Sequence, residues 1–462
     1  MKKLPTQSEG EFNNSCRRKD WANKTHDEKT RRLLNDDAKY FLHQSISTPC
    51  LSAISKAEGA YIEDLQGNRY LDFHGNNVHH IGYGHPRLKE AISKQMDDLS
   101  FAPRRFSCEQ SVNLAKKLCE ISPGNLSKVL FTTGGSDAIE VALKLARAAT
   151  GRYKTISFWD SFHGAGYGAS SIGGEQLFRS DIFGPLVPGS EHVAPFDCYR
   201  CPYGYPDLNG APQLDVCNMT CEKFIKYVLE KEGDVAAVIA EPARAVPYIP
   251  PPGFWAAVRK ACDDHGTMLI FDEIPTGLGK SGKMFACEHD QTVPDILVLG
   301  KALGGGIMPI AAVLVKPELD ILGEYAIGHY THEKNPVSAY AALTTIQIIE
   351  EEGLVENASR LGNYAIERLK SLKTKHPSIG DVRGRGFLFG IELVSNKNNK
   401  TPADDLAEEV FYRCLDKGLS FKISMGNVLT FTPPLILTKS QMDFAIETIS
   451  NCLGKAEKQS GK

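Results

Sequence analysis

Short runs of hydrophobic residues alternate with amphipathic stretches through the middle of the chain. The runs resemble β-strands in composition and lie at 128–133, 154–159, 235–242, 267–273 and 295–300. Between them, residues 137–150 place Ala138, Ala142 and Leu145 on one helical face, and residues 254–265 also have a helical pattern. This alternation predicts an α/β fold with a mainly parallel sheet and helices on both faces.

The two ends of the chain predict a second, smaller domain. Residues 59–73 alternate apolar and aromatic positions around a turn at 66–68, which is typical of a β-hairpin. From about residue 337 the pattern changes to a long helix over 337–352, then to helical and short strand segments through 453. We therefore expect residues 76–336 to form the large domain. Residues 337–462 should form the C-terminal part of a small α+β domain, which residues 1–75 join.

The composition excludes several classes of protein. Of 462 residues, 42% are hydrophobic and 24% charged, with a net charge of -3, values typical of a soluble globular chain. No long basic run is present, so nucleic acid is not an expected partner. No apolar stretch approaches the roughly 18 residues that span a bilayer, so a membrane is not expected either. The first forty residues lack an apolar signal-peptide core, which predicts a cytoplasmic protein.

The twelve cysteines include one cluster with metal-ligand spacing. Its members form two close pairs, namely Cys198 with Cys201 and Cys217 with Cys221. Such pairs resemble a structural zinc site. The alternative is a set of reduced thiols packed in an insertion, which we favour, and we expect no metal at the functional site.

Candidate chemistry follows the predicted strands, where ligands of open α/β sheets bind. Gly135 and Ser136 begin a helix after the first strand, and small residues at a helix N-terminus suit a phosphate. Further candidates near strand ends are Phe162, Glu241, Asp272 and Lys301, the last entering a glycine-rich loop. A Schiff-base lysine, an acid for a pyridinium nitrogen, a stacking aromatic ring and a phosphate cup are the parts of a pyridoxal 5'-phosphate (PLP) site.

Several separate motifs together resemble the class III (omega) aminotransferases, which have the aspartate aminotransferase-like PLP fold type I. They span residues 59–435 and include FTTGGSDAIEVALKLAR, Phe162-His163-Gly164, Asp272-Glu273, Lys301-Ala-Leu-Gly-Gly-Gly and Asn335-Pro336. The resemblance implies PLP as cofactor. It implies that Lys301 forms the Schiff base and acts as acid and base, that Asp272 keeps the pyridine nitrogen protonated, and that Phe162 stacks on the ring. The implied phosphate ligands are Gly135, Ser136 and, from the partner subunit of a homodimer with shared active sites, Thr331.

Three departures from the family pattern bear on the reaction. Pro275 occupies the position of the usual glutamine, and Thr430 occupies that of an arginine that grips a substrate carboxylate. Arg244 is an additional arginine in the segment after Glu241. Because a threonine cannot replace the arginine's salt bridge, the sequence points away from transamination with a keto-acid acceptor.

A lyase needs no acceptor, and the segment 330–336 looks most like that of family lyases acting on hydroxylated aminophosphonates. We therefore expect an ammonia-lyase for a substrate such as (R)-1-hydroxy-2-aminoethylphosphonate, giving phosphonoacetaldehyde and ammonia. Candidate substrate ligands are Arg244, Asn76, Asn77 and Glu241, and further cations considered for the phosphonate are Arg104, Arg105 and Lys334. The alternatives are an omega-aminotransferase of an amine or β-amino acid, and a non-catalytic PLP-binding paralogue.

Overall fold

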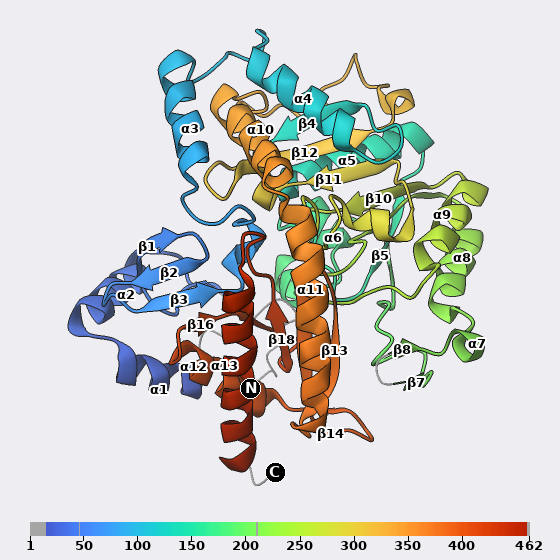
Figure 1. Ribbon diagram of the computed structural model, residues 1–462. Coiled ribbons are helices and arrows are strands. Elements are labelled where there is room, and N and C mark those ends of the chain that lie inside the picture. The colour runs from blue at the N-terminus through green and yellow to red at the C-terminus, as the bar shows by residue number, and fades with distance from the viewer. Residues whose placement is uncertain (1–14, 46, 209–210, 460–462) are drawn as a thin grey trace.

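A seven-stranded sheet forms the centre of the molecule in the computed structural model, which describes residues 15–45, 47–208 and 211–459 (Figure 1). In sheet order the strands are β4 (Lys128–Thr132), β12 (Ala311–Val315), β11 (Ile296–Leu299), β10 (Met268–Asp272), β9 (Val235–Ala240), β5 (Lys154–Phe158) and β6 (Ser190–Val193). Only β12 runs antiparallel to its neighbours, so the sheet is mixed. The expected α/β class and the five expected strands are confirmed, and β12 and β6 are additions.

Alternate strand residues pack against different helices, as the two-residue period of a strand requires. In β10, Ile270 belongs to the apolar cluster with α5 (Gly135–Thr150), whereas Leu269 and Phe271 belong to the cluster with α9 (Phe254–His265). The other helices around this sheet are α3 (Pro86–Asp98), α4 (Glu109–Ile121), α6 (Tyr167–Ile172), α7 (Leu214–Cys217), α8 (Thr220–Glu232) and α10 (Pro336–Glu351). Helices therefore cover both faces of the sheet, as predicted.

A separate two-stranded sheet pairs β7 (Asp207–Leu208) with β8 (Ala211–Pro212). Two other sheets, smaller than the seven-stranded one, lie below it in Figure 1. One contains β1 (Ile54–Glu58), β2 (Tyr61–Asp64), β3 (Arg69–Asp72) and β16 (Leu419–Ser420). The other contains β13 (Ile379–Arg385), β14 (Leu388–Asn396), β18 (Val428–Phe431) and β17 (Lys422–Ser424), with β15 (Thr401–Pro402) pairing β14. Antiparallel pairing of β2 with β3 confirms the predicted hairpin.

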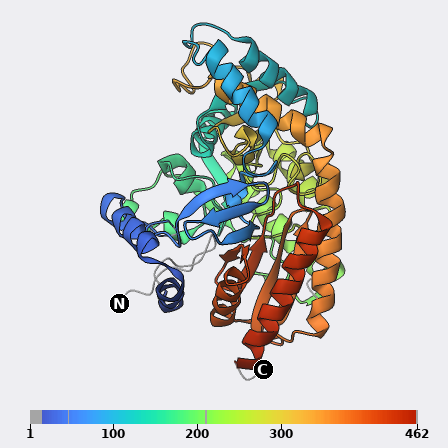
Figure 2. The same ribbon diagram turned by 60° about the vertical axis from the view of Figure 1, so that its left-hand side comes forward.

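The two ends of the chain meet in these smaller sheets. β3 pairs in parallel with β16, and Figure 2 shows the blue N-terminal strands close to the red C-terminal elements. The helices here are α1 (Cys16–Thr25), α2 (Glu28–Tyr40), α11 (Leu354–Ser371), α12 (Asp404–Leu415) and α13 (Lys439–Gln459), and α1 packs on α12. This pairing supports the proposed union of residues 1–75 with 337–462, whose boundaries remain a prediction. No helix in the described ranges is long and apolar enough to cross a membrane.

A buried lysine ties the loop after β10 to the end of β18. The Lys280 side chain is fully buried, and its Nζ donates hydrogen bonds to the carbonyl oxygens of Pro433 at 2.7 Å and Thr432 at 3.3 Å. Burial lowers the pKa of Lys280 to about 7, although the charge of Asp72 favours the protonated form. The link between the large sheet and the strand carrying Thr430 is therefore sensitive to pH.

We expect the free energy of unfolding to rise between pH 7 and pH 9 because of Lys280. In this window the unfolded chain keeps a proton on Lys280, whose ordinary pKa is 10.5, whereas the folded protein releases it. This difference in proton binding should raise the free energy of unfolding by up to about 1.4 kcal/mol per pH unit. Denaturant titrations at the two pH values should show this gain in the wild type and in Lys283→Met, an exposed neighbour, but not in Lys280→Met. An equal pH dependence in all three proteins would contradict the assignment.

Candidate functional site

One cavity lies at the carboxyl ends of the parallel strands, where the sequence places its candidate chemistry. It has a volume of about 190 Å³. Six predicted site residues line it, namely Gly135, Ser136, Phe162, Glu241, Asp272 and Lys301. The remaining wall is formed by His163, Gly164, Ala245, Ile274 and Pro275. The fold therefore brings residues from five segments of the chain to one place.

Lys301 stands where strand β11 ends and the short helix η5 (Lys301–Gly304) begins. Its backbone has a φ of 45°, in the left-handed region that is unfavourable for a residue with a Cβ atom. The side chain is exposed rather than packed, and it lies on the cavity wall. Such strain is typical of functional positions.

Asp272 is held by a residue that the sequence alone did not single out. Its carboxylate is 2% exposed at the end of β10, and His163 Nδ1 donates a 2.8 Å hydrogen bond to Asp272 Oδ2. The other ring nitrogen, His163 Nε2, is buried and has no hydrogen-bond partner among the described residues. Asp272 Oδ1 accepts from the N–H of Ile274, so both carboxylate oxygens are fixed. This pair presents a rigid buried negative charge to the cavity.

The start of α5 forms a close backbone cradle. At Gly135 a Cβ atom would lie 2.7 Å from Ile274 Cδ1, so a larger residue would require the Ile274 side chain to move. At Gly164 a Cβ atom would lie 2.6 Å from Ser136 Oγ, and that oxygen already accepts a hydrogen bond from the N–H of Ala165. The first N–H groups of this sixteen-residue helix are free of helical partners by geometry, which suits an anion.

These features fit PLP. The cradle at Gly135 and Ser136 would hold the phosphate, the buried Asp272 would face the ring nitrogen, and Lys301 would supply the amine. Phe162 is half-buried on the same wall and packs against Phe178 with a ring-centroid distance of 4.5 Å, so its ring is supported for stacking. Pro275 also lines the wall, so the usual glutamine side chain has no counterpart at that position.

Several predicted residues lie outside the cavity wall. Arg244 is 3% exposed and lies 3.6 Å from Glu241 and 4.0 Å from Glu175, measured between nitrogen and carboxylate oxygen. It contacts the cavity through Glu241, which itself accepts a 3.0 Å hydrogen bond from the N–H of Ala245. Thr331 is exposed in the segment before α10 and is not on the wall formed by this subunit. Its role from a partner subunit remains a prediction.

Asn76 and Asn77 belong to the short helix η1 (Gly75–Asn77), which packs against η5 and so lies beside Lys301. Both have positive φ values, 46° and 60°. The Asn77 side chain is buried, and its Oδ1 has no hydrogen-bond partner among the described residues. This oxygen is a buried polar group in need of a partner, and it lies on the short helix that packs against the one containing Lys301.

The other cations considered for a phosphonate are not on the wall. Arg104 contacts His329 and forms a 3.8 Å ion pair with Glu333, and Arg105 and Lys334 are exposed. A cation that the sequence did not single out is Lys422, which is 8% exposed and pairs with Thr430 across β17 and β18. Burial and then the charge of Lys422 lower the pKa of His74 to about 4, and the charge of Lys301 acts in the same direction. Lys422 therefore lies near His74, although it is not among the residues that line the cavity.

Thr430 is buried, with 2% exposure, and its Oγ1 donates a 3.0 Å hydrogen bond to Ser424 Oγ. Its hydroxyl is thus engaged inside the small sheet. No basic side chain occupies this position of β18.

The clustered cysteines surround a different, small cavity of about 30 Å³, with Phe196, Tyr203 and several prolines. Burial raises the pKa of Cys198 to about 12 and that of Cys221 to about 11, so both are neutral thiols. Within residues 15–45, 47–208 and 211–459, no group of three or more metal-ligating side chains has a geometry that holds a metal ion.

Comparisons with known proteins define the class. The family model for class III aminotransferases matches residues 43–453, and the chain belongs to this family of PLP enzymes. It is 43% identical to an (R)-1-hydroxy-2-aminoethylphosphonate ammonia-lyase of Vibrio splendidus, over 98% of this chain and 96% of that one. It is 37% identical to a leucine/methionine racemase of Thermococcus litoralis, over 87% and 90% of the two chains.

A solved structure supports the same family and cofactor. The omega transaminase of Pseudomonas jessenii in complex with PMP superposes with a TM-score of 0.85 at 29% identity, covering 93% of this chain and 99% of that one. The fold is therefore PLP fold type I, and the cofactor is PLP. The chain is an enzyme of this family, whose relatives include lyases, racemases and aminotransferases.

Proposed function

We propose that this enzyme is a PLP-dependent ammonia-lyase that converts (R)-1-hydroxy-2-aminoethylphosphonate to phosphonoacetaldehyde and ammonia. The observation that carries the proposal is Thr430, which is buried and bonded to Ser424 where the family places a carboxylate-binding arginine. A substrate without an α-carboxylate has no need of that arginine. Similarity to the Vibrio splendidus lyase over almost the whole chain supports the same substrate class.

The reaction balances without a second substrate. The carbon that bears nitrogen loses a proton, and the neighbouring carbon loses its hydroxyl as hydroxide, which leaves an enamine. The enamine becomes an imine and takes up water to give the aldehyde and ammonia. One water is released and one is consumed, so no keto acid takes part.

PLP, when bound, withdraws electrons from the substrate carbon and so makes its proton acidic. Asp272, fixed by His163, holds a proton at the ring nitrogen, which strengthens this withdrawal. Lys301 Nζ takes the proton from the substrate carbon because its strained backbone places it on the cavity wall. Hydroxide is a poor leaving group and needs a proton donor, a role for which Lys301 in its protonated form is the candidate on this wall.

Lys422 supplies a cation for the phosphonate. It is buried on β17 next to Thr430, so a lysine stands one strand away from the missing arginine. The charges of Lys422 and Lys301 both lower the pKa of His74, so both lysines lie near this histidine. A dianionic phosphonate is held best by such fixed cations together with hydrogen-bond donors.

We expect Lys422→Met to raise the KM for the aminophosphonate by about 10- to 100-fold, the effect of losing one charge-assisted hydrogen bond. Turnover at saturation should change much less, because Lys422 does not take part in proton transfer. Steady-state kinetics on Lys422→Met, Lys422→Arg and the exposed control Lys56→Met test this. An unchanged KM in Lys422→Met would remove Lys422 from the substrate site.

Arg244, Asn76, Asn77 and Glu241 complete the proposed substrate side. Glu241 lies on the cavity wall, and Arg244, which is not on the wall, forms an ion pair with it. Asn77 Oδ1 and the neighbouring Asn76 amide would orient the substrate hydroxyl beside Lys301. The site is completed in a homodimer by Thr331 of the other subunit, and the enzyme acts in the cytoplasm.

The competing function is an omega-aminotransferase, which the similarity to the Pseudomonas jessenii enzyme favours. The two are distinguished by the state of the cofactor after the holoenzyme has consumed amine substrate with no acceptor present. A lyase returns the cofactor to its aldehyde form, whereas an aminotransferase leaves pyridoxamine phosphate. Absorbance spectra report this directly, and accumulation of pyridoxamine phosphate would refute the lyase. A spectrum that does not respond to any amine would favour a non-catalytic paralogue.

A further inference from the structure

Two cysteines that are far apart in the sequence meet between helices α12 and α13. These helices pack side by side, and Cys414 and Cys452 lie close enough for each to shift the pKa of the other. Cys414 is fully buried, and Cys452 is 4% exposed. Neither belongs to the PLP site, so the pair has no part in the proposed reaction.

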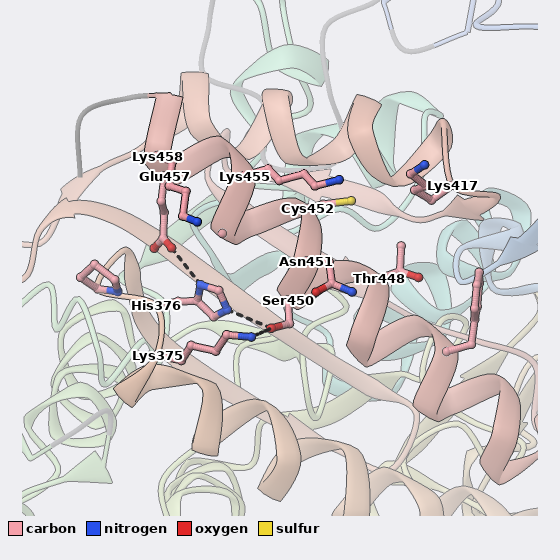
Figure 3. Close-up of a pocket in the computed structure, with 13 residues that line it drawn as sticks. Lys375, His376, Lys417, Thr448, Ser450, Asn451, Cys452, Lys455, Glu457 and Lys458 are labelled. Atoms are coloured by element: carbon pink, nitrogen blue, oxygen red, sulfur yellow. Dashed lines mark hydrogen bonds and ion pairs between the residues drawn. The ribbon is translucent and has the colours of Figure 1, made fainter.

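Cys452 reaches a separate cavity of about 770 Å³ beside α13. Figure 3 shows its sulfur next to the ammonium end of Lys455, with Lys417 on the facing side. On the other part of this cavity, His376 bridges Glu457 and Ser450 with hydrogen bonds of 2.8 and 2.9 Å. The cavity therefore gives small solutes a route to one of the two thiols.

The two thiols differ in ionisation. The hydrogen bond from Cys414 lowers the pKa of Cys452, and the charges of Lys455, Arg413 and Lys417 lower it further, against the effect of burial. Burial raises the pKa of Cys414 well above its ordinary value. Cys452 is thus the nucleophilic thiol of the pair, and Cys414 is the protonated one.

The lysines beside Cys452 are not neutralised by acids. Neither Lys417 nor Lys455 forms an ion pair with a carboxylate in the described part of the chain, whereas Lys439 on the same helix pairs with Asp443 at 2.6 Å. Their charges face the cavity, and a positive cavity raises the local concentration of anionic reagents.

We propose that Cys452 is a site of thiol–disulfide exchange with small anionic disulfides, and that Cys414 resolves the product. The Cys452 thiolate attacks one sulfur of the disulfide, forms a mixed disulfide and releases one thiolate. Cys414 then gives up its proton and attacks the Cys452 sulfur, so that the second small thiolate leaves. The two protein thiols are oxidised to one bond between α12 and α13, and the small disulfide is reduced to two thiols.

The test compares disulfides of opposite charge on the PLP-loaded, full-length protein at pH 7. Glutathione disulfide is anionic and cystamine is cationic, and peptide mapping by mass spectrometry identifies the modified cysteine. Cys452 should react about tenfold faster with glutathione disulfide than with cystamine. It should also react faster than Cys119, whose pKa is raised by burial. Equal rates for the two disulfides, or slower reaction than Cys119, would overturn the proposal.

Variants separate the two steps. Cys414→Ser keeps a donor to Cys452 but cannot resolve, so the mixed disulfide should accumulate in place of the internal bond. The double variant Lys455→Ala, Lys417→Ala should abolish the preference for the anionic disulfide. The control is Lys458→Ala, because Lys458 lines the same cavity but its charge does not act on Cys452. The preference should be unchanged in this control. If Cys452 still formed an intramolecular disulfide in Cys414→Ser, another cysteine would be its partner, and this would contradict the proposed role of Cys414.

Discussion

Lys301→Ala should lower turnover by at least about 10³-fold, the range expected for removal of the residue that transfers the proton. The described residues on the cavity wall include no second lysine, so no neighbouring amine can take over. The fold should be retained, since the Lys301 side chain is exposed and supports no packing. Relief of the left-handed backbone strain is small, because alanine also has a Cβ atom.

The control for Lys301→Ala is Lys283→Ala, which removes an exposed lysine from the loop after β10. Initial rates should be unchanged in this control. Dialysis gives a second measurement, because PLP that has lost its covalent attachment should leave Lys301→Ala and remain on the control. Full turnover in Lys301→Ala would overturn the assignment of the chemistry.

Asp272→Asn should lower turnover by about 10²- to 10³-fold, a loss typical of removing one preorganised electrostatic group. The substitution keeps the size of the side chain but removes the buried charge that holds a proton at the ring nitrogen. The hydrogen bond from His163 Nδ1 can still be accepted by the amide oxygen, so geometry is largely retained. The defect should therefore appear in kcat more than in KM.

The matched control for Asp272→Asn is Asp264→Asn, which removes an exposed carboxylate paired with Lys260 on α9. It should leave kcat unchanged, and circular dichroism should show the same secondary structure for both variants and the wild type. If Asp272→Asn retained wild-type kcat, Asp272 would not be the partner of the ring nitrogen.

Much of the site could be predicted because it lies at strand ends in short, local motifs. The apolar runs of β10 and β11 end close to the candidate residues Asp272 and Lys301. Since parallel strands bring their carboxyl ends to one edge, separate motifs converge on one cavity. The start of α5 at Gly135 follows from small residues that allow close backbone approach.

The features that were missed depend on contacts between distant segments. The motif Phe162-His163-Gly164 does not show which group His163 contacts, and only the fold brings its Nδ1 to Asp272. Lys422 lies opposite Thr430 because of the pairing between β17 and β18. The sequence of so short a strand does not reveal the register of this pairing. Strand β12 was missed because its antiparallel insertion breaks the β-α alternation. The approach of Cys414 to Cys452 likewise depends on the packing of α12 against α13.

As a lyase, the enzyme should release ammonia and not transfer it to an acceptor. The most direct test is to incubate the PLP-loaded enzyme with (R)-1-hydroxy-2-aminoethylphosphonate in the absence of any keto acid, and to follow ammonia and aldehyde over time. We expect equal amounts of ammonia and phosphonoacetaldehyde over many turnovers. Turnover that occurs only when pyruvate or 2-oxoglutarate is added would contradict it.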